Sequence, residues 1–253
     1  MTTQPFPDTA ALWPGRTSVL VTGGSSGIGA AIALEWARLG FTVGCASRRG
    51  TTPADSARLV GLKLDVSDEF AVSEVVGEYI ESHGPLAGVI NCAGYYDPKP
   101  SATLPLADLR TVLETNLVSA VQISQLAFPG LKEHGGGFIG NIGSFYADLG
   151  VPNSLAYAAS KAGMAAVTRT LAVEWARYGI SLVNFEPGYI ETGLNAEFVA
   201  DPENRAMLER KIPARRLGTA EEVARLVVRV LTSDCSFLTG ESIRIDGGQA
   251  IRL

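Results

Sequence analysis

The chain has few of the residues that build metal centres, disulfide frameworks and histidine-based active sites. It contains three cysteines and two histidines in 253 residues. Cys45, Cys92 and Cys235 are odd in number and widely separated, which matches neither a metal-ligand spacing nor a disulfide framework. We therefore expect three reduced thiols and no metal site.

A basic excess and a long apolar run are also missing. The formal net charge is −5, whereas nucleic-acid-binding domains present a basic face, so we expect no nucleic-acid partner. No apolar run is long enough to span a bilayer, which argues against a membrane partner. Residues 1–16 lack the basic start and apolar stretch of a signal peptide, so we expect a cytoplasmic protein.

The two histidines stand where helices are expected to end. His83 precedes Gly84, and His134 precedes a run of three glycines. A histidine in the last turn suits the negative end of the helix dipole, and a following glycine suits the left-handed cap. This position predicts structural histidines rather than catalytic ones.

Apolar segments are plentiful, and they alternate between strand-like runs and helical patterns. Hydrophobic residues make up 46% of the chain, enough for one sizeable core. The strand runs are continuous, which is typical of a parallel sheet covered by helices on both faces. We predict a Rossmann-type, doubly wound α/β fold with a parallel sheet of about seven strands. One domain over residues 17–253 follows an N-terminal arm over 1–16.

The same patterns place the individual elements. Strands are expected at Ser18–Thr22, Phe41–Ala46, Gly61–Leu64, Leu86–Ile90, Phe138–Ile142, Ile180–Phe185 and Ser242–Ile245. Helices are expected at Gly27–Leu39, from Ser67 or Asp68 to Ser82, and at Asp108–Glu133, Ser154–Tyr178, Asn195–Lys211 (interrupted at Asp201-Pro202) and Ala220–Thr232. The link 47–60 is short and contains Pro53, so we expect a loop or a single turn there.

The segment Ser18–Gly40 combines a strand, a glycine-rich turn and a helix. The turn is Thr22-Gly23-Gly24-Ser25-Ser26-Gly27-Ile28-Gly29. A helix N-terminus presents unpaired N–H groups and the positive end of the helix dipole, so such a turn suits a pyrophosphate. Gly23 allows the bend, Gly27 close backbone approach and Gly29 helix-to-strand packing. A structural loop is the alternative, since the spacing differs from the Gly-x-Gly-x-x-Gly fingerprint.

Several other polar segments also follow predicted strands. In parallel sheets ligands bind outside the carboxyl ends of the strands, so these segments should meet at one edge. They are Ser47–Arg49, Asp65-Val66, Asn91–Gly94, Ser144 and Pro187-Gly188.

Tyr157 and Lys161 are the reactive candidates. Positions i and i+4 share one helix face, and a nearby ammonium favours the phenolate, so the pair forms a tunable proton donor. An ordinary surface pair is the alternative. Asn116 stands inside a predicted helix despite its poor helix propensity, and Ser144 ends a strand. Taken singly, each suits a buried amide or a capping serine as well.

Together these motifs resemble the short-chain dehydrogenase/reductase family, in its branch of about 250 residues. Thr22-Gly23-x-x-x-Gly27-Ile28-Gly29 is similar to that family's cofactor motif. Asn91-Cys92-Ala93-Gly94 resembles its Asn-Asn-Ala-Gly, with Cys92 as a departure. Further matches are Pro187-Gly188-x-x-x-Thr192, Asp246-Gly247-Gly248, and Asn116, Ser144, Tyr157 and Lys161 as a four-residue active site.

The resemblance implies a dinucleotide-binding catalytic domain that interconverts a ketone and a secondary alcohol. Tyr157 would move a proton to or from the substrate oxygen, and Lys161 would bind the nicotinamide ribose and depress the Tyr157 pKa. Ser144 would bind the substrate oxygen, and Asn116 would hold a water that continues the proton path. The implied cofactor contacts are Gly23, Ser25, Ser26, Gly27, Ile28, Gly29, Ser47, Arg48, Arg49, Asp65, Val66, Asn91, Ala93, Gly94, Tyr157, Lys161, Pro187, Gly188, Ile190 and Thr192.

The end of the second strand bears on which nicotinamide cofactor is used. NAD-selective sites place an acidic residue there, whereas this chain has Ser47 followed by Arg48. A guanidinium can grip a 2′-phosphate in two bonds, so we predict NADP(H), with NAD(H) possible. Solvated loop charges at Arg48 and Arg49 are the alternative.

Aromatic and leucine side chains on the same loops predict a hydrophobic or aromatic substrate. They are Tyr95, Tyr96, Phe145, Tyr146, Leu149, Tyr189, Leu194 and Phe198, and several of them could equally be core residues. The family places a mobile substrate segment here, at about 189–212.

Other functions remain open at this point. Reduction of a 3-oxoacyl thioester is an alternative, because many family members perform it. A nucleotide-sugar epimerase would need a longer chain, and a non-catalytic NADP sensor would not need Tyr157 and Lys161. The resemblance also implies a homotetramer or homodimer formed through the two long helices and the C-terminal strand.

Overall fold

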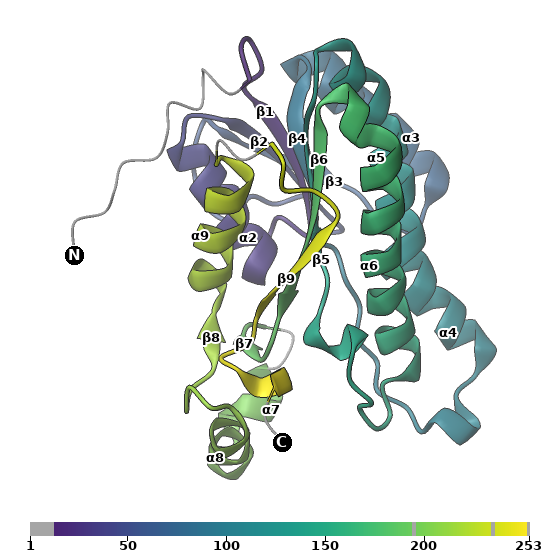
Figure 1. Cartoon of the computed structure of the whole chain (residues 1–253), viewed down its shortest axis with the longest axis vertical. Coiled ribbons are helices and arrows are strands. Elements are labelled where there is room, and N and C mark those ends of the chain that lie inside the picture. Colours follow the sequence, from purple (N-terminus) through teal and green to yellow (C-terminus); the bar gives the residue numbers. More distant parts are fainter. Residues whose placement is uncertain (1–12, 194–195, 234–235, 252–253) are drawn as a thin grey trace.

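Seven parallel strands form one sheet in the order β3-β2-β1-β4-β5-β6-β9 (Figure 1). The structure is a computed structural model and describes residues 13–193, 196–233 and 236–251. The strands are β1 (Ser18–Thr22), β2 (Thr42–Ser47), β3 (Leu59–Lys63), β4 (Leu86–Asn91), β5 (Gly137–Ile142), β6 (Ile180–Pro187) and β9 (Glu241–Ile245). From β1 the chain first adds β2 and β3 on one side of the sheet, and it then returns to add β4, β5 and β6 on the other side of β1. This is the switch point at which doubly wound sheets bind ligands, and the predicted fold is confirmed.

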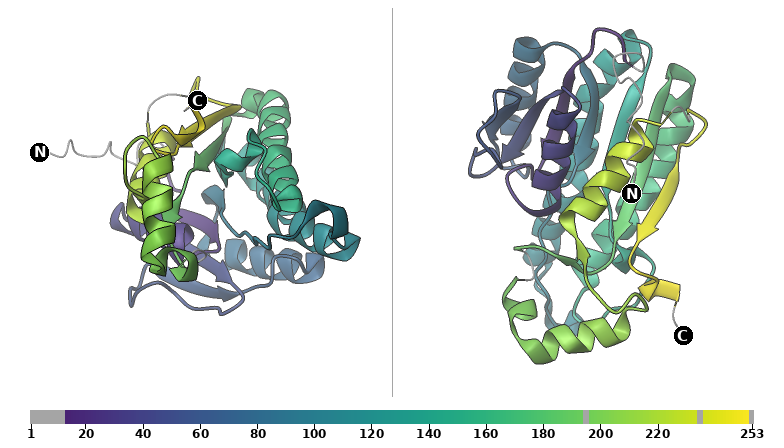
Figure 2. Two further views of the ribbon diagram at one scale, coloured as in Figure 1. Left: turned by 90° about the horizontal axis from the view of Figure 1, so that it is seen from below. Right: turned by 90° about the vertical axis from the view of Figure 1, so that its left-hand side faces the viewer.

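Helices cover both faces of this sheet. Helices α2 (Gly27–Arg38) and α9 (Ala220–Leu231) lie on one face, and α9 crosses in front of the strands in the right-hand view of Figure 2. Helices α3 (Glu69–His83), α5 (Ser119–Glu133) and α6 (Leu155–Trp175) lie on the other face. Each face has its own core, with Trp36 and Val223 in one and Tyr79 and Ile123 in the other. Among the described residues, no helix has the length and apolar character that crossing a membrane requires.

A small subregion projects beyond the carboxyl ends of the strands, at the bottom of Figure 1. It contains α7 (Ala196–Ala200), α8 (Pro202–Lys211) and the short pair β7 (Ile190–Glu191) and β8 (Gly218–Thr219). The predicted interruption at Asp201-Pro202 is confirmed, because the Asp201 carboxylate caps α8 by accepting from the N–H groups of Glu203 and Asn204. A separate apolar cluster holds this subregion together.

The stretch expected as one helix, Asp108–Glu133, is not regular. Helix α4 (Leu106–Leu113) begins two residues earlier and passes into a π-helical turn at Glu114–Val118 before α5 starts. A π turn inserts extra backbone into a helix and is frequent at functional sites. The apolar periodicity that predicted the helix does not reveal such an insertion.

Most other elements lie within two residues of their predicted bounds. No helix forms in the described link between β2 and β3, as expected from Pro53. His83 is the last residue of α3 and His134 is the C-cap of α5, and Gly84 and Gly135 follow with φ of 78° each. The predicted place of both histidines at helix ends is confirmed.

The end of the predicted N-terminal arm belongs to the core. Trp13 is 8% exposed, and its ring contacts Trp36, Phe41 and Phe138. Arg16 is 5% exposed and donates to the carbonyl of Gly136. Contacts between residues so distant in sequence are not visible in local composition, which is why the sequence placed these residues outside the domain.

Candidate active site

The carboxyl edge of the sheet brings the predicted site segments together. Because the strands are parallel, the segments that follow β1, β2, β3, β4, β5 and β6 all start at this edge. The Thr22 hydroxyl shows how close two of them are, since it accepts from the backbone N–H groups of Cys92 and Ala93, each at 3.0 Å. The ends of β1 and β4 are thereby joined at the switch point.

Two glycines of the turn after β1, Gly23 and Gly29, stand where a side chain would be crowded by backbone. Gly23 has φ of 68°, and a Cβ on it would lie 3.1 Å from the Cys92 carbonyl oxygen. A Cβ on Gly29 would lie 2.4 Å from the Gly23 carbonyl oxygen. These glycines let the start of α2 approach the ends of β1 and β4, as the sequence predicted.

The N-terminus of α2 lies beside Thr192. Its N-cap, Ser26, makes no side-chain capping bond, so no capping hydroxyl competes for the first N–H groups of the helix. A Cβ on Gly27 would fill the space beside Thr192, 3.5 Å from its Cγ2 atom. Backbone donors, a positive helix end and a cradle that a side chain would block together fit a dinucleotide pyrophosphate.

Basic and acidic side chains flank the next two strand ends. Arg48 and Arg49 are exposed after β2, and Arg49 Nη2 donates to Ser25 Oγ at 3.1 Å, so it reaches the glycine turn. Asp65 Oδ1 accepts from the N–H and the hydroxyl of Ser67 after β3. These hydrogen bonds lower the pKa of Asp65, and the positive charge of Arg48 adds to the effect.

Helix α6 places Tyr157 and Lys161 beside the end of β5. Lys161 is 4% exposed, and its Nζ donates to the Ile142 carbonyl at 2.7 Å while lying 5.6 Å from the centroid of the Tyr157 ring. The predicted sharing of one helix face is observed. The amine lies over the face of the Tyr157 ring.

Burial controls the electrostatics of this pair. It raises the pKa of Tyr157 to about 12, while a hydrogen bond with Ser144 opposes the rise. Burial also lowers the pKa of Lys161 to about 8. Both shifts favour the neutral form, as expected for groups removed from water. The net shift of the Tyr157 pKa is therefore opposite to the expected depression, because desolvation of the phenol is the largest cause and Lys161 is not among the groups that shift it.

Asn116 lies in the π-helical turn and is 1% exposed. Its Oδ1 accepts from the Tyr95 N–H at 2.7 Å, and its Nδ2 donates to the Tyr95 carbonyl at 3.0 Å and to Ser160 Oγ at 3.1 Å. The extra backbone of the π turn carries the amide into this position. Both amide protons are committed within the protein, so Asn116 ties the segment after β4 to α6.

Ser144 caps the short 3₁₀ turn Phe145–Ala147 that follows β5. Its Oγ accepts from the Tyr146 N–H at 3.2 Å, and its hydroxyl also bonds to Tyr157. Ser144, Tyr157 and Lys161 are thus brought together.

Asn91, expected at the cofactor, points into the protein. It is 4% exposed, and its Nδ2 donates to Asn141 Oδ1 at 2.8 Å and to Ser124 Oγ at 3.2 Å. Strand alternation explains the difference, because Asn91 is the last residue of β4 and faces α5. Gly94 instead lies at the site, where a Cβ would be 3.8 Å from both Asn116 Oδ1 and Lys161 Nζ.

Aromatic rings surround Tyr157. The Tyr96 and Tyr146 rings meet it edge-on at centroid distances of 5.0 and 5.7 Å. Phe145 and Tyr189 extend the cluster, and the hydroxyl oxygens of Tyr146 and Tyr189 are 3.1 Å apart. We call these five residues the aromatic cup. Its rings come from the segments after β4, β5 and β6 and from α6.

The other predicted pocket residues are exposed or half-buried, or lie outside the described residues. Tyr95 is 40% exposed and is held through its backbone, and Leu149 is half-buried. Phe198 on α7 is 46% exposed. Leu194 lies outside the described residues.

Comparisons with known proteins agree with this geometry. A family model described as "Enoyl-(Acyl carrier protein) reductase" matches residues 23–250. The chain belongs to the short-chain dehydrogenase/reductase family. Like other short-chain dehydrogenases/reductases, it is an oxidoreductase that binds a nicotinamide cofactor.

The names of similar proteins in this family refer to different substrates. The 3-oxoacyl-acyl-carrier-protein reductase FabG of Pseudomonas aeruginosa is 35% identical, over 90% of this chain and 95% of its own. Glucose 1-dehydrogenase of Gluconobacter oxydans is 32% identical, over 91% and 90%. The gluconate 5-dehydrogenase of Burkholderia cenocepacia, solved in complex with NADP and tartrate, is 25% identical with a TM-score of 0.86, over 94% of this chain and 96% of its own.

Sequence reasoning missed two serines that hydrogen-bond to residues of this short-chain dehydrogenase/reductase site. Ser160 accepts from Asn116, and the Ser154 hydroxyl lies 3.1 Å from the Tyr96 hydroxyl. The spacing of Ser160 from Tyr157 places it on the same side of α6, which was the available signal. Nothing in the sequence marked the π turn.

Proposed function

We propose that this protein is an NADP(H)-dependent oxidoreductase that interconverts a ketone and a secondary alcohol, as in EC class 1.1.1. One observation carries the proposal. The Tyr157 phenol is bonded to Ser144, has the Lys161 amine over its ring, and lies in the aromatic cup at the sheet edge where the glycine turn also lies. A proton donor and a dinucleotide cradle at one edge suit carbonyl reduction.

Each catalytic side chain has a role in this proposal. The Ser144 hydroxyl binds the substrate oxygen, and Tyr157 donates the proton to that oxygen in reduction and accepts it in oxidation. A Tyr157 pKa of about 12 keeps the phenol protonated at neutral pH, which is the form reduction requires. Lys161 binds the ribose hydroxyls, and Asn116 fixes α6 against the segment after β4. A bound nicotinamide supplies or takes the hydride.

The cofactor is held mostly by backbone in this proposal. The turn residues bind the pyrophosphate, Asp65 and Val66 the adenine, and the segment after β6 the carboxamide. The proposed contacts are Gly23, Ser25, Ser26, Gly27, Ile28, Gly29, Asp65, Val66, Ala93, Gly94, Pro187, Gly188, Ile190 and Thr192.

Two arginines support a preference for NADP(H). Arg48 and Arg49 are exposed at the end of β2, where Ser47 stands in place of a carboxylate, and Arg49 already contacts Ser25. A 2′-phosphate in this place would meet two guanidinium groups and no carboxylate at the strand end. The related gluconate 5-dehydrogenase was solved with NADP, which agrees with this preference.

The ratio of kcat/KM for NADPH over NADH tests this preference. We expect wild type to prefer NADPH, and Arg48→Ala to lower the ratio by about tenfold, the scale of one charged phosphate contact. Arg177→Ala is the matched control, because Arg177 is exposed on the turn after α6, far from β2 in the sequence. A wild-type preference for NADH, or an unchanged ratio in Arg48→Ala, contradicts the proposal.

The aromatic cup supports a hydrophobic or aromatic substrate, since its rings offer apolar faces beside Tyr157. Similarity to the 3-oxoacyl-acyl-carrier-protein reductase favours a 3-oxoacyl thioester as the second candidate. A panel of aryl ketones, aliphatic ketones, 3-oxoacyl thioesters and secondary alcohols, followed by NADPH absorbance, separates the two. Tight NADPH binding without turnover over the whole panel points to a cofactor sensor instead.

Segment 189–212 is proposed to close over the substrate. Its helices α7 and α8 pack on a small cluster of Val199, Leu208, Ile212 and Leu217, separate from the two main cores. A subregion with its own small core opens at lower cost than the sheet does. Exchange of backbone amides in this segment, measured with and without NADPH and product, checks the closure.

An assembly of two or four copies is also proposed. Val118, Leu155 and Val173 leave 45%, 50% and 85% of their surface exposed on the long helical elements of one face. Light scattering after size exclusion measures the oligomeric state directly.

A further inference from the structure

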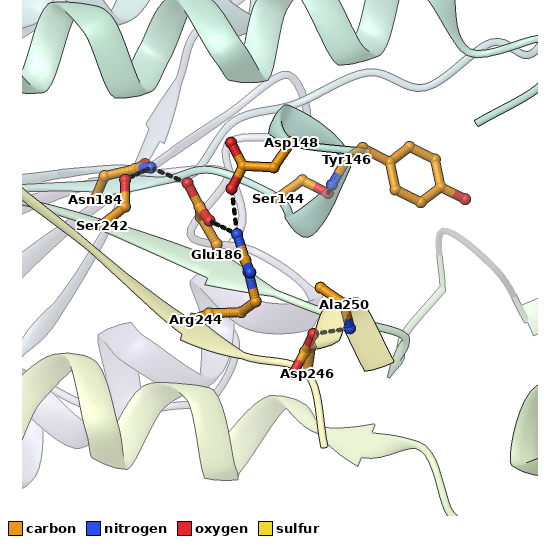
Figure 3. Close-up of polar contacts among 9 residues, drawn as sticks. All are labelled: Ser144, Tyr146, Asp148, Asn184, Glu186, Ser242, Arg244, Asp246 and Ala250. Atoms are coloured by element: carbon orange, nitrogen blue, oxygen red, sulfur yellow. Dashed lines mark hydrogen bonds and ion pairs between the residues drawn. The ribbon is translucent and has the colours of Figure 1, made fainter. Parts of the chain in front are cut away.

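Arg244, on the edge strand β9, joins two loops of the proposed site. Its Nη2 lies 3.3 Å from Glu186 Oε2 and also pairs with the carboxylate of Asp148 (Figure 3). Strands β6 and β9 pair in register at Glu186 and Arg244, so the backbone places the two side chains opposite each other. One guanidinium therefore bridges two segments that are far apart in the sequence.

Glu186 is the fixed end of this bridge. It is 2% exposed, and its other oxygen accepts from Asn184 Nδ2 at 3.0 Å. The same Nδ2 donates to Ser242 Oγ at 2.8 Å, which is again on β9. A buried carboxylate needs a partner charge and hydrogen bonds, because leaving it unpaired is strongly destabilising. Glu186 therefore holds Arg244 in one orientation.

Asp148 is the end of the bridge that lies at the catalytic loop. It follows the 3₁₀ turn Phe145–Ala147, whose N-cap is Ser144. The Asp148 side chain is 61% exposed, and the ion pair with Arg244 holds its carboxylate. Fixing Asp148 fixes the far end of the turn that begins at Ser144.

Glu186 directly precedes the Pro187-Gly188 turn at the end of β6. That turn is also anchored to β9, because the Gly188 N–H donates to the Ile245 carbonyl at 2.9 Å. A Cβ on Gly188 would lie 2.7 Å from the Asp246 Cα, so the backbone after β6 is in close contact with the backbone after β9. The turn that is proposed to contact the nicotinamide is therefore held on β9 at two neighbouring points.

A second contact joins the same two loops from the other side. The Tyr146 hydroxyl meets the Tyr189 hydroxyl at 3.1 Å, within the aromatic cup. In Figure 3 the Tyr146 side chain points away from Arg244, so the two contacts lie on different sides of the Ser144 turn. Two such contacts restrain both the separation and the tilt of the loops.

We infer that Arg244 is a positioning residue for Ser144. By holding Asp148 against Glu186, it sets the place of the Ser144 turn relative to the Pro187-Gly188 turn. This inference rests on the proposed function, since it assigns Ser144 and the Pro187-Gly188 turn to the two reactants. Hydride transfer depends steeply on the alignment of the two reactants, so a small shift of the turn reduces the rate.

Hydrogen exchange and kinetics of Arg244→Gln and Asp148→Asn test the inference. We expect faster exchange of backbone amides in 143–150 in both variants, with α2 and α9 unchanged. With a ketone that wild type reduces, we expect kcat to fall by about tenfold or more, the scale of a misplaced reacting group. The Kd of NADPH should stay at the wild-type value. A larger kinetic isotope effect with deuterated NADPH should accompany the loss, because hydride transfer becomes slower.

Three controls separate positioning from simple destabilisation. The double variant Arg244→Gln with Glu186→Gln removes the bridge without leaving a buried lone charge, so it covers the case in which Arg244→Gln alone fails to fold. Arg244→Lys keeps the charge and should recover part of kcat. Arg177→Gln removes an exposed charge on the turn after α6 and should change neither readout.

The outcomes distinguish this inference from the proposed function. Wild-type exchange of 143–150 in Arg244→Gln and Asp148→Asn overturns the inference, whatever the kinetics show. Faster exchange with kcat unchanged overturns it too, because the loosened turn then does not position Ser144. If wild type reduces no ketone while exchange still rises in the variants, the proposed function fails and the bridge remains a structural clamp on this turn.

Discussion

The glycine turn after β1 and the aromatic cup after β4, β5 and β6 lie at the same edge of the sheet, but they are built from different atoms. The turn uses backbone, and its glycines fall within one short stretch, Gly23–Gly29. The cup uses side chains from four separate segments, held by contacts such as Asn116 to Tyr95 and Tyr146 to Tyr189. Local spacing is enough to specify the first, whereas the second exists only when the chain has folded.

The two regions also treat charge differently. The turn leaves the first N–H groups of α2 free of a side-chain cap, so it offers positive potential to an anion. Burial raises the pKa of Tyr157 in the cup and lowers that of Lys161 beside it, so both groups tend towards neutrality. We therefore expect substitutions in one region to affect binding of the dinucleotide and those in the other to affect proton transfer.

The largest effect should come from Tyr157→Phe. Removing the hydroxyl removes the proposed proton donor, so kcat/KM for ketone reduction should fall by about 10²- to 10⁴-fold. The Kd of NADPH, measured by fluorescence titration, should change little, because the glycine turn is untouched. Tyr96→Phe is the matched control, as it loses a hydroxyl from the same cup. Near-native turnover by Tyr157→Phe contradicts the proposed mechanism. A fall in NADPH affinity as large as the fall in kcat/KM contradicts the separation of the two regions.

Gly29→Ala should have the opposite signature. Its Cβ would lie 2.4 Å from a backbone oxygen that cannot rotate away, so the turn must shift. We expect the Kd of NADPH to rise by about tenfold or more, with kcat at saturating cofactor much less affected.

Gly77→Ala provides the control for a helical glycine. Gly77 lies in α3, and a Cβ there meets nothing within 4 Å. It should stabilise the fold by about 0.5–1 kcal/mol, through better helix propensity, without changing Kd. Equal Kd values in the two glycine variants mean that Gly29 is not needed for the turn's shape.

A pH-dependent effect is expected at Lys161. Its pKa is about 8 in the folded protein against an ordinary value of 10.5. Between these values the unfolded chain binds more protons, so this group makes stability rise with pH there. Lys161→Met lacks this titration. The free energy of unfolding of the variant minus that of wild type should therefore fall from pH 8 to pH 10, by at most about 1.4 kcal/mol per pH unit.

Denaturant unfolding of Lys161→Met at several pH values measures this slope. The exposed Lys211→Met, at the end of α8, serves as the control and should show a constant difference from wild type. A difference that stays constant for Lys161→Met as well contradicts the burial argument.

What the sequence could predict follows the same division. Periods and spacings along the chain were enough to predict the glycine turn, the doubly wound parallel sheet, and the shared helix face of Tyr157 and Lys161. The direction of the Tyr157 shift was not predicted, because spacing shows a neighbouring amine but not how much water is removed from the phenol. Glu186 stands next to Pro-Gly and looks like a surface charge, and only the pairing of β6 with β9 shows that it is buried against Arg244.

The π turn at Glu114–Val118 changes how the helix on either side of it must be aligned. Each residue of an α-helix advances by about 100°, so one extra residue rotates the inward face by that angle. The apolar side of α4 is thereby free to meet α6, while that of α5 meets β4 and α3. A comparison of relatives that treats 106–133 as one uninterrupted helix will assign core positions correctly on one side of Asn116 and shift them by one residue on the other.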